Sequence, residues 1–387
     1  MTPDCGLFGA DKILDTSYFQ VDTIKNPMNK LLPFAVFAFL FCLDSLVFRT
    51  GFYLRNLEPV SAAGLMMNYI WHEQARRPQS AGAPQVLALG DSRMAFDSVL
   101  ANSLQTGCEF GSIAVPGTLP RVWYYMLREV DPDARKYAAI IIPAEDYDDE
   151  DWENFSKRQS DIQFTAMLLQ PGDLLEFILS YPDWEGRRLA ARACVLRGLA
   201  LRGDFQDLLV NYKRRLSHTL EERGLKAFEI YDAHWKKRNL TGLAVDWTAW
   251  RLTNPPGATE DQKRSLNDNL LRGTAPQIGY LAEYQRKWFG KIVDRYRTSP
   301  TRVIFVRLPR GPVVRPASLV VKKSSSIREF ASRRGVKLAP EHLFDEIERP
   351  EWFGDATHMN NEGGARFSRI LAREIARILD SGKESGR

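Results

Sequence analysis

The stretch Gln85-Val-Leu-Ala-Leu-Gly-Asp-Ser92 decides the fold that we expect for this chain of 387 residues. Its first part, 85–89, is a short, largely apolar run that ends at Gly90. Such a run is typical of a strand that is buried on both faces of a parallel sheet. We therefore expect Asp91 and Ser92 at the carboxyl end of a strand, in a turn that leads into a helix.

Three further apolar runs predict strands of the same sheet, at 110–115, 138–142 and 303–306. Helical patterns follow at 120–130 and at 367–379, where apolar residues recur every three or four positions. Strands that alternate with helices predict an α/β fold with three layers (α/β/α), a doubly wound parallel sheet of the flavodoxin-like type. Residues that directly follow the strands of such a sheet meet at one edge.

The remaining parts of the chain surround this sheet. We expect an N-terminal tail, a transmembrane helix, a linker, one domain with a helical insertion, and a short C-terminal tail. Their ranges are 1–30, 31–48, 49–84, 85–380 with the insertion at about 150–300, and 381–387.

Residues 31–48 read LLPFAVFAFLFCLDSLVF, which predicts one transmembrane helix. Such a helix is about 27 Å long, close to the roughly 30 Å of a hydrocarbon core. The alternative is a buried core helix, because Asp44 interrupts the run. In a membrane, Asp44 would face a partner helix or lie near enough to the interface to reach water. We expect a single-pass membrane protein in contact with lipid, with its main domain on the extracytoplasmic side.

Charge and cysteine content argue against several classes of protein. A net charge of +5 is mild for this length and gives no reason to expect a nucleic-acid partner. The four cysteines form no Cys-x-x-Cys pair, and no histidine lies at ligand spacing from them, so we expect no metal site and no cofactor. The acidic run at 146–153 lacks the spacing of a calcium loop and fits a solvated turn better.

Basic residues cluster in the insertion, and two interpretations stay open. They are the solvated face of amphipathic helices, or they contact anionic lipid headgroups or an acidic polymer. The residues are Arg187, Arg188, Arg192, Arg197, Arg202, Lys213, Arg214 and Arg215.

Ser92 is the candidate nucleophile. Directly after a strand, its side chain would be exposed and its backbone N–H would point at a developing oxyanion. A serine hydroxyl needs a base. His358 is the candidate, because Asp355 precedes it by three residues and both side chains can leave one turn. Each motif alone is a common turn or surface loop, but together at expected strand ends they predict a nucleophilic serine site.

Three segments resemble the sequence blocks of the SGNH (GDSL-like) hydrolase superfamily. They are Leu87-Ala-Leu-Gly-Asp-Ser-Arg93, Val115-Pro-Gly117 and Asp355-Ala-Thr-His358. The resemblance covers roughly 85–147 and 301–379. The N-terminal helix and the segment Leu308-Pro-Arg-Gly311 are similar to membrane-tethered members, which include envelope proteins that help to O-acetylate polysaccharides or D-alanylate teichoic acids.

The resemblance implies a role for each matching residue. Ser92 would be the nucleophile, His358 the base and Asp355 the group that orients the histidine. The backbone N–H groups of Ser92 and Gly117 would be oxyanion donors. The family's third donor is an asparagine in a Gly-x-Asn-Asp block, and the equivalent stretch here, Pro143-Ala-Glu-Asp146, has none. Losing one such donor costs about 10²–10³ in rate.

Charged residues at the expected edge of the site are candidates for binding a substrate. The arginines among them would bind an acidic substrate or else pair with nearby acids. The candidates are Asp91, Arg93, Glu145, Asp146, Arg307 and Arg310.

Two functions of different classes follow. The first is a membrane-anchored serine esterase or O-acyltransferase that acts on acyl esters of a cell-envelope glycan through an acyl-serine intermediate. The second is a non-catalytic accessory subunit of the same fold, which binds a glycan or a multi-span membrane acyltransferase. The missing asparagine motivates the second hypothesis.

Overall fold

The computed structural model describes residues 27–56, 62–80, 82–145, 147, 158–216, 234–271, 280–314, 316 and 326–384. The chain divides into two compact units, Met1–Leu43 and Asp44–Arg387. Helix α1 (Pro27–Asp44) leads up to the boundary between them. The segment Leu31–Arg49 has a mean hydropathy of 2.3, and only 6% of it is buried. A helix of this length and composition is either a single membrane span or a signal sequence.

Five parallel strands form the central sheet in the order β2-β1-β3-β6-β7. The strands are β1 (Gln85–Gly90), β2 (Glu109–Ala114), β3 (Ala139–Ala144), β6 (Arg302–Arg307) and β7 (Val336–Leu338). Numbered within this sheet alone, the order is 2-1-3-4-5, the flavodoxin-like arrangement. The predicted parallel α/β fold is confirmed. The first four strands lie within two residues of their predicted positions, whereas β7 was not predicted.

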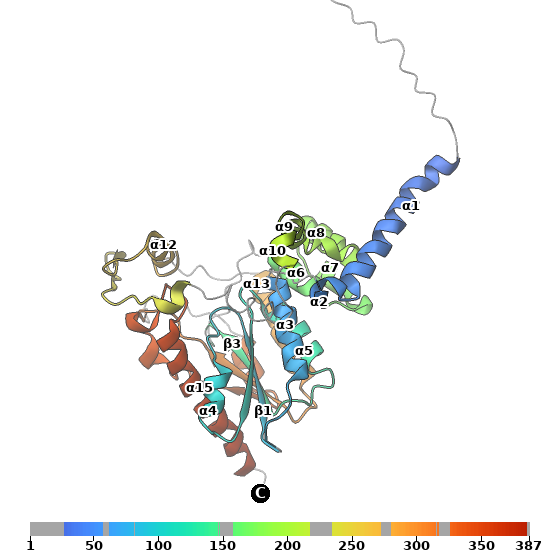
Figure 1. Ribbon diagram of the computed structural model, residues 1–387. Coiled ribbons are helices and arrows are strands. Elements are labelled where there is room, and N and C mark those ends of the chain that lie inside the picture. The colour runs from blue at the N-terminus through green and yellow to red at the C-terminus, as the bar shows by residue number, and fades with distance from the viewer. Residues whose placement is uncertain are drawn as a thin grey trace, which may run out of the picture. The chain divides into compact units, whose positions relative to one another are not determined.

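Different helices cover the two faces of the sheet (Figure 1). Side chains alternate along a strand, so Leu87 and Leu89 of β1 belong to one core and Val86 and Ala88 to the other. The first core also holds residues of α3, α5, α13 and α14, and the second holds residues of α4 and α15. These helices are α3 (Ala62–Ala75), α4 (Ser98–Ser103), α5 (Pro120–Val130), α13 (Tyr280–Arg295), α14 (Ser326–Ala331) and α15 (Asn361–Glu384).

Helix α3 lies in the stretch 49–84, the expected linker, in which the sequence pattern also indicated a helix at 62–77. Its side chains Met66 and Ile70 are buried in the first core, and Glu73 is buried as well. Helix α15 likewise continues to Glu384, past the expected domain end at 380. The second unit therefore includes more of the chain than the resemblance to the SGNH blocks covers.

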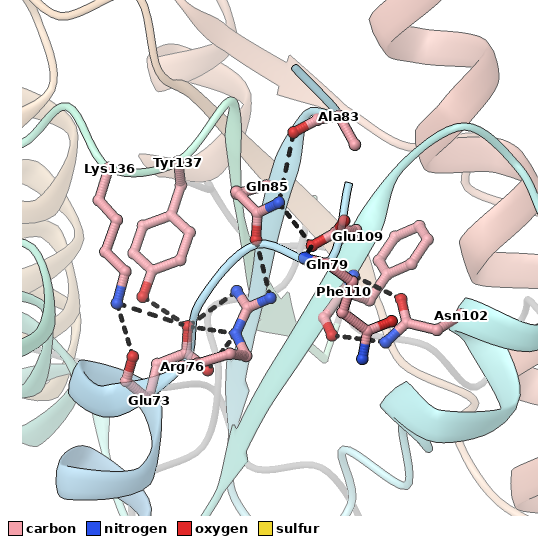
Figure 2. Close-up of polar contacts among 10 residues, drawn as sticks. All are labelled: Glu73, Arg76, Gln79, Ala83, Gln85, Asn102, Glu109, Phe110, Lys136 and Tyr137. Atoms are coloured by element: carbon pink, nitrogen blue, oxygen red, sulfur yellow. Dashed lines mark hydrogen bonds and ion pairs between the residues drawn. The ribbon is translucent and has the colours of Figure 1, made fainter. Parts of the chain in front are cut away.

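A polar network binds the end of α3 to the amino-terminal edge of the sheet (Figure 2). The Tyr137 hydroxyl donates to the Glu73 carboxylate at 2.8 Å, and the Arg76 guanidinium bridges Glu73 and Gln85. Gly111 of β2 leaves the room for this network, because a Cβ there would lie 2.5 Å from Glu73 Oε2. These contacts hold the edge opposite to the one where Ser92 lies.

The described part of the insertion is mostly helical, with one antiparallel hairpin. Its elements are α6 (Arg158–Ala166), η3 (Pro171–Asp173), α7 (Leu174–Leu179), α8 (Trp184–Val195), η4 (Arg197–Leu199), α9 (Arg202–Val210), α10 (Tyr212–Leu216), η5 (His234–Lys237), β4 (Ala244–Asp246), β5 (Arg251–Thr253) and α12 (Glu260–Asn269). The short elements that complete the list are η1 (Ser45–Arg49), α2 (Phe52–Asn56), η7 (Asp345–Ile347) and η8 (Pro350–Trp352).

The chain enters the second unit at Asp44, which is bound to the insertion. The Asp44 carboxylate accepts the backbone N–H groups of Arg197 at 2.9 Å and Gly198 at 2.7 Å. The Arg49 guanidinium donates to the carbonyls of Cys194 and Val195, both at 2.8 Å. Asp44 therefore finds its partners in its own chain, at the start of η4, where a negative charge is favourable.

Candidate active site

Ser92 lies in a tight turn at the carboxyl end of β1. The turn closes with a hydrogen bond from the Met94 N–H to the Asp91 carbonyl at 3.1 Å. The Asp91 side chain supports it by accepting the Arg93 N–H at 2.9 Å. The chain folds back so closely that a Cβ on Gly90 would lie 2.4 Å from the Cβ of Met94. Glycine at position 90 thus lets the strand turn sharply and present Ser92.

The base lies on a loop directly before α15. Phe353 and Met359 form an antiparallel bridge, and the Gly354 N–H donates to the His358 carbonyl at 2.9 Å. Inside this loop, Asp355 Oδ1 accepts the N–H groups of Thr357 and His358, both at 2.8 Å. Backbone hydrogen bonds therefore hold the Asp355 carboxylate in place independently of its contact with the histidine ring.

The fold brings the three predicted catalytic residues into one hydrogen-bonded chain. Ser92 Oγ lies 2.8 Å from His358 Nε2, although the two residues are 266 positions apart. On the other side of the ring, His358 Nδ1 lies 2.9 Å from Asp355 Oδ2. A carboxylate at Nδ1 favours the tautomer with the proton on that nitrogen. Nε2 is then free to accept the proton of the Ser92 hydroxyl, which is the arrangement of a serine nucleophile and its base.

The Asp355 carboxylate is held in its charged form. Burial alone would raise its pKa, but the hydrogen bond and charge of His358 and the two backbone N–H groups outweigh burial and lower the pKa below the ordinary value. A carboxylate whose pKa is lower in the folded state stabilises the fold fully above the unfolded pKa of about 4. This stabilisation is lost as the pH falls through the lower, folded pKa.

We expect the free energy of unfolding to depend less on pH in acid when Asp355 is replaced by asparagine. Between about pH 5 and pH 2, the free energy of unfolding of the wild type should fall more steeply than that of the variant, because the variant has no carboxyl to protonate at this position. Urea denaturation of both proteins over this range measures the difference. Parallel curves would contradict the assignment of a lowered pKa to Asp355.

Trp235, from the insertion, covers the histidine. Its ring stacks on the His358 imidazole with centroids 4.3 Å apart and planes inclined by 23°. The stacking restricts rotation of the imidazole, so it helps to keep Nε2 directed at Ser92. No sequence pattern distinguishes Trp235 from the other tryptophans of the insertion, because its contact with His358 depends on the fold alone.

The insertion also braces the loop that carries the base. Gly354 packs so closely on the backbone of η5 that a Cβ there would lie 1.9 Å from the Trp235 carbonyl oxygen. The Gln262 side chain of α12 donates to the Gly354 carbonyl at 2.9 Å. The Leu240 N–H donates to the Pro350 carbonyl at 3.0 Å. Residues 234–262 are therefore part of the scaffold of the site.

The turn with Gly117 lies beside the serine turn. The Val115 N–H and the Thr118 hydroxyl both donate to the Gly90 carbonyl, at 2.9 and 3.1 Å. Gly117 has φ +77°, a conformation that favours glycine, and a Cβ there would meet nothing within 4 Å. Among the described residues, neither the Ser92 nor the Gly117 N–H donates to a backbone acceptor. Within this described part of the chain, no backbone acceptor would therefore compete with a substrate oxygen for these two amides.

Arg93 neutralises the acidic residues beside Ser92. Its guanidinium lies 3.0 Å from Asp91 Oδ2 and also binds the Glu145 carboxylate. Burial would raise the pKa of Asp91, but the charge and hydrogen bonds of Arg93, with a contribution from the charge of His358, lower it instead. The Glu145 carboxylate is turned toward this arginine.

Arg307 and Arg310 differ in their surroundings. Arg307 is 1% exposed, and it binds Glu348 at 2.8 Å and Asp345 at 2.7 Å. Arg307 thus takes part in an internal network of ion pairs and is not accessible to a substrate at the edge of the site. The backbone N–H of Arg310 donates to the Glu348 carboxylate at 3.0 Å, and its side chain is partly exposed.

Two further residues lie outside the described part of the chain. They are Asp146, a candidate substrate-binding residue, and Asn154, an asparagine that lies near it in the sequence. Within the described residues, no group of three or more His, Cys, Asp or Glu side chains is arranged to hold a metal ion.

Comparison with known proteins adds no relative to this geometry. No protein-family model matches the chain, and no curated protein matches it. The chain therefore belongs to the class of α/β folds with a parallel, five-stranded sheet.

Proposed function

We propose that this protein is a membrane-anchored serine esterase or O-acyltransferase, of the SGNH type, that acts on acyl esters of a cell-envelope glycan. The observation that carries the proposal is the chain of contacts from Ser92 Oγ through His358 to Asp355, at 2.8 and 2.9 Å. Such a chain activates a hydroxyl for attack on an acyl carbonyl.

The reaction has two transfer steps. Ser92 Oγ attacks the acyl carbonyl while its proton passes to His358 Nε2, and the imidazolium is stabilised by Asp355. The N–H groups of Ser92 and Gly117 donate to the oxyanion. When the ester bond breaks, His358 returns the proton to the leaving alcohol, and an acyl-serine remains. Water or a sugar hydroxyl then gives its proton to His358 and attacks the acyl-serine. When the bond to Ser92 Oγ breaks, His358 returns the proton to this oxygen, and a free acid or a new ester is released.

The pairing of Arg93 with Glu145 bears on the missing asparagine. Arg93 forms an ion pair with the Glu145 carboxylate and so reduces the repulsion between this carboxylate and an oxyanion at Ser92. The site then works with two backbone donors, so a slow hydrolysis is expected. The missing donor slows attack by water and attack by a sugar hydroxyl alike, because both pass through the same oxyanion.

A fluorescent phosphonate that reacts with activated serines tests the proposal. Wild-type protein should be labelled covalently, and Ser92→Ala should not. Ser112→Ala is the matched control, because Ser112 lies in the neighbouring strand β2 and contacts no histidine among the described residues. Absence of label on the wild type, or equal label on Ser92→Ala, would refute the proposal.

The second candidate is a non-catalytic subunit that binds a glycan or a multi-span acyltransferase. The ion pair between Arg93 and Glu145 in place of a third donor favours it. It predicts that Ser92→Ala and His358→Ala retain full biological function while they fold and localise normally. Loss of function in both folded variants would exclude it.

A further inference from the structure

We propose that the helices α7, α8, η4 and α9 of the insertion form a surface that lies on an anionic lipid bilayer. This lipid-facing surface is defined by six exposed apolar residues: Leu175, Leu179, Trp184, Leu199, Leu209 and Val210. The proposal does not rest on the proposed function of Ser92.

The insertion contacts the last residues of the apolar segment, which belong to the same unit as the insertion. Asp44 and Arg49 lie within the apolar stretch Leu31–Arg49 or at its end, and their side chains are bound to residues 194–198. If the apolar segment spans a bilayer, Ser45–Arg49 lies at its interface. The end of α8 and the start of η4 then also lie close to that interface, because they are hydrogen-bonded to Asp44 and Arg49.

The elements that carry the surface are joined to one another from this point. Phe48 packs on Phe205 of α9 with ring centroids 6.2 Å apart. A Cβ on Gly198 of η4 would lie 2.6 Å from the Phe48 ring, so the two segments are in close contact. Helix α8 packs on α7 and on η4, and α9 packs on η4 and on α10. The exposed apolar residues are thus carried by helices that contact one another around the Asp44 junction.

One face of α8 combines apolar and basic residues. Trp184, Arg188, Arg192 and Val195 follow at helical spacing, and all four are exposed. A face of this composition is typical of helices that lie in the plane of a membrane, where tryptophan sits at the headgroups and arginine binds lipid phosphates.

The charge on the described residues of 175–213 fits an anionic partner. Its exposed basic side chains are Arg188, Arg192, Arg202 and Lys213, against the single exposed acid Glu185. Other members of the basic cluster are internal: Arg215 is buried against Asp204, and Arg197 donates to the Leu169 carbonyl. Along the sequence, the exposed bases therefore alternate with the exposed apolar residues, a composition that favours an anionic bilayer.

Tryptophan quenching in nanodiscs tests the surface with the full chain. Val210 and Val99 form a matched pair of valines, since they are 80% and 79% exposed, but Val99 lies on α4 against β2 and α15. Val210→Trp and Val99→Trp would be compared with the wild type in discs whose lipids carry brominated acyl chains. Both changes are on exposed positions, so folding is preserved, which circular dichroism verifies.

The expected results separate the two sites. Bromination should quench a larger fraction of the emission of Val210→Trp than of the wild type, because the added indole contacts lipid. For Val99→Trp the quenched fraction should fall below the wild-type value, because the added indole remains in water. Trp184→Phe should also lower the quenched fraction, through the loss of a lipid-exposed indole.

The role of charge is measured with the same discs. Adding an anionic lipid to a zwitterionic disc should raise the quenched fraction of Val210→Trp, and the pair Arg188→Glu and Arg192→Glu should abolish that rise. If Val210→Trp behaves as Val99→Trp does, the proposal is overturned. If its emission is shielded only in discs that hold two copies, the occupant is a second copy, and the proposal is overturned as well.

Discussion

Replacing His358 by alanine is expected to lower the rate of aryl acetate hydrolysis by about 10⁴–10⁶-fold. The imidazole is the base within reach of the Ser92 hydroxyl, at 2.8 Å, and without it the hydroxyl stays protonated. The measurement is the rate at which the coloured alcohol is released at a saturating ester concentration. The rate is divided by the concentration of folded protein. A loss of less than tenfold would mean that Ser92 does not depend on His358.

His342→Ala is the control for this variant. His342 also pairs with an aspartate three residues away, with Nδ1 at 2.8 Å from Asp345 Oδ2, but it is 78% exposed on the side chain and does not contact Ser92. A histidine–aspartate pair alone therefore does not distinguish the two positions. Only the contact with the serine does, so His342→Ala should leave the rate unchanged.

Replacing Arg307 by methionine is expected to destabilise the protein by about 3–5 kcal/mol, the largest effect on stability that we predict. Glu348 is fully buried, and Arg307 contacts it at 2.8 Å. Removing the arginine leaves a carboxylate without its main counter-charge inside the protein. The midpoint and slope of urea denaturation, followed by tryptophan fluorescence, give the change in the free energy of unfolding.

Arg377→Met provides the comparison for that change. Arg377 pairs with Glu374 on the surface of α15, where its side chain is 65% exposed. The Glu374 side chain is 10% exposed, but water and salt screen the exposed guanidinium, so removal of Arg377 should change the unfolding midpoint far less than removal of Arg307. Equal destabilisation by both substitutions would contradict the distinction between a buried and a solvated ion pair.

The parallel sheet was predictable because its central strands are buried on both faces. The runs at 85–89 and 138–142 are apolar throughout most of their length, and nothing but a parallel strand or a buried helix has that pattern. Strand β7 escaped prediction, because it has three residues at the edge of the sheet and its central Lys337 is exposed. Its pairing with β6 comes from tertiary contacts.

The three residues Ser92, Asp355 and His358 were predictable for a different reason. Each follows or precedes a regular element, so topology alone brings them to one edge of the sheet. Trp235, by contrast, reaches His358 through a packing contact between η5 and the loop at Gly354, which no local pattern encodes. The same holds for Arg93 and Glu145, whose pairing depends on the register of two strands that do not adjoin in sequence.

The direct connection between the two units at Asp44 affects how the protein encounters its substrate. A flexible tether of some thirty residues would let a domain sweep a radius of roughly 30 Å. Here Leu43 ends the first unit, and the very next residue is already hydrogen-bonded to the insertion. If the apolar helix is retained in a membrane, the second unit has no such tether and cannot sweep that radius. Turnover would then depend on acyl donors that diffuse along the membrane to the protein.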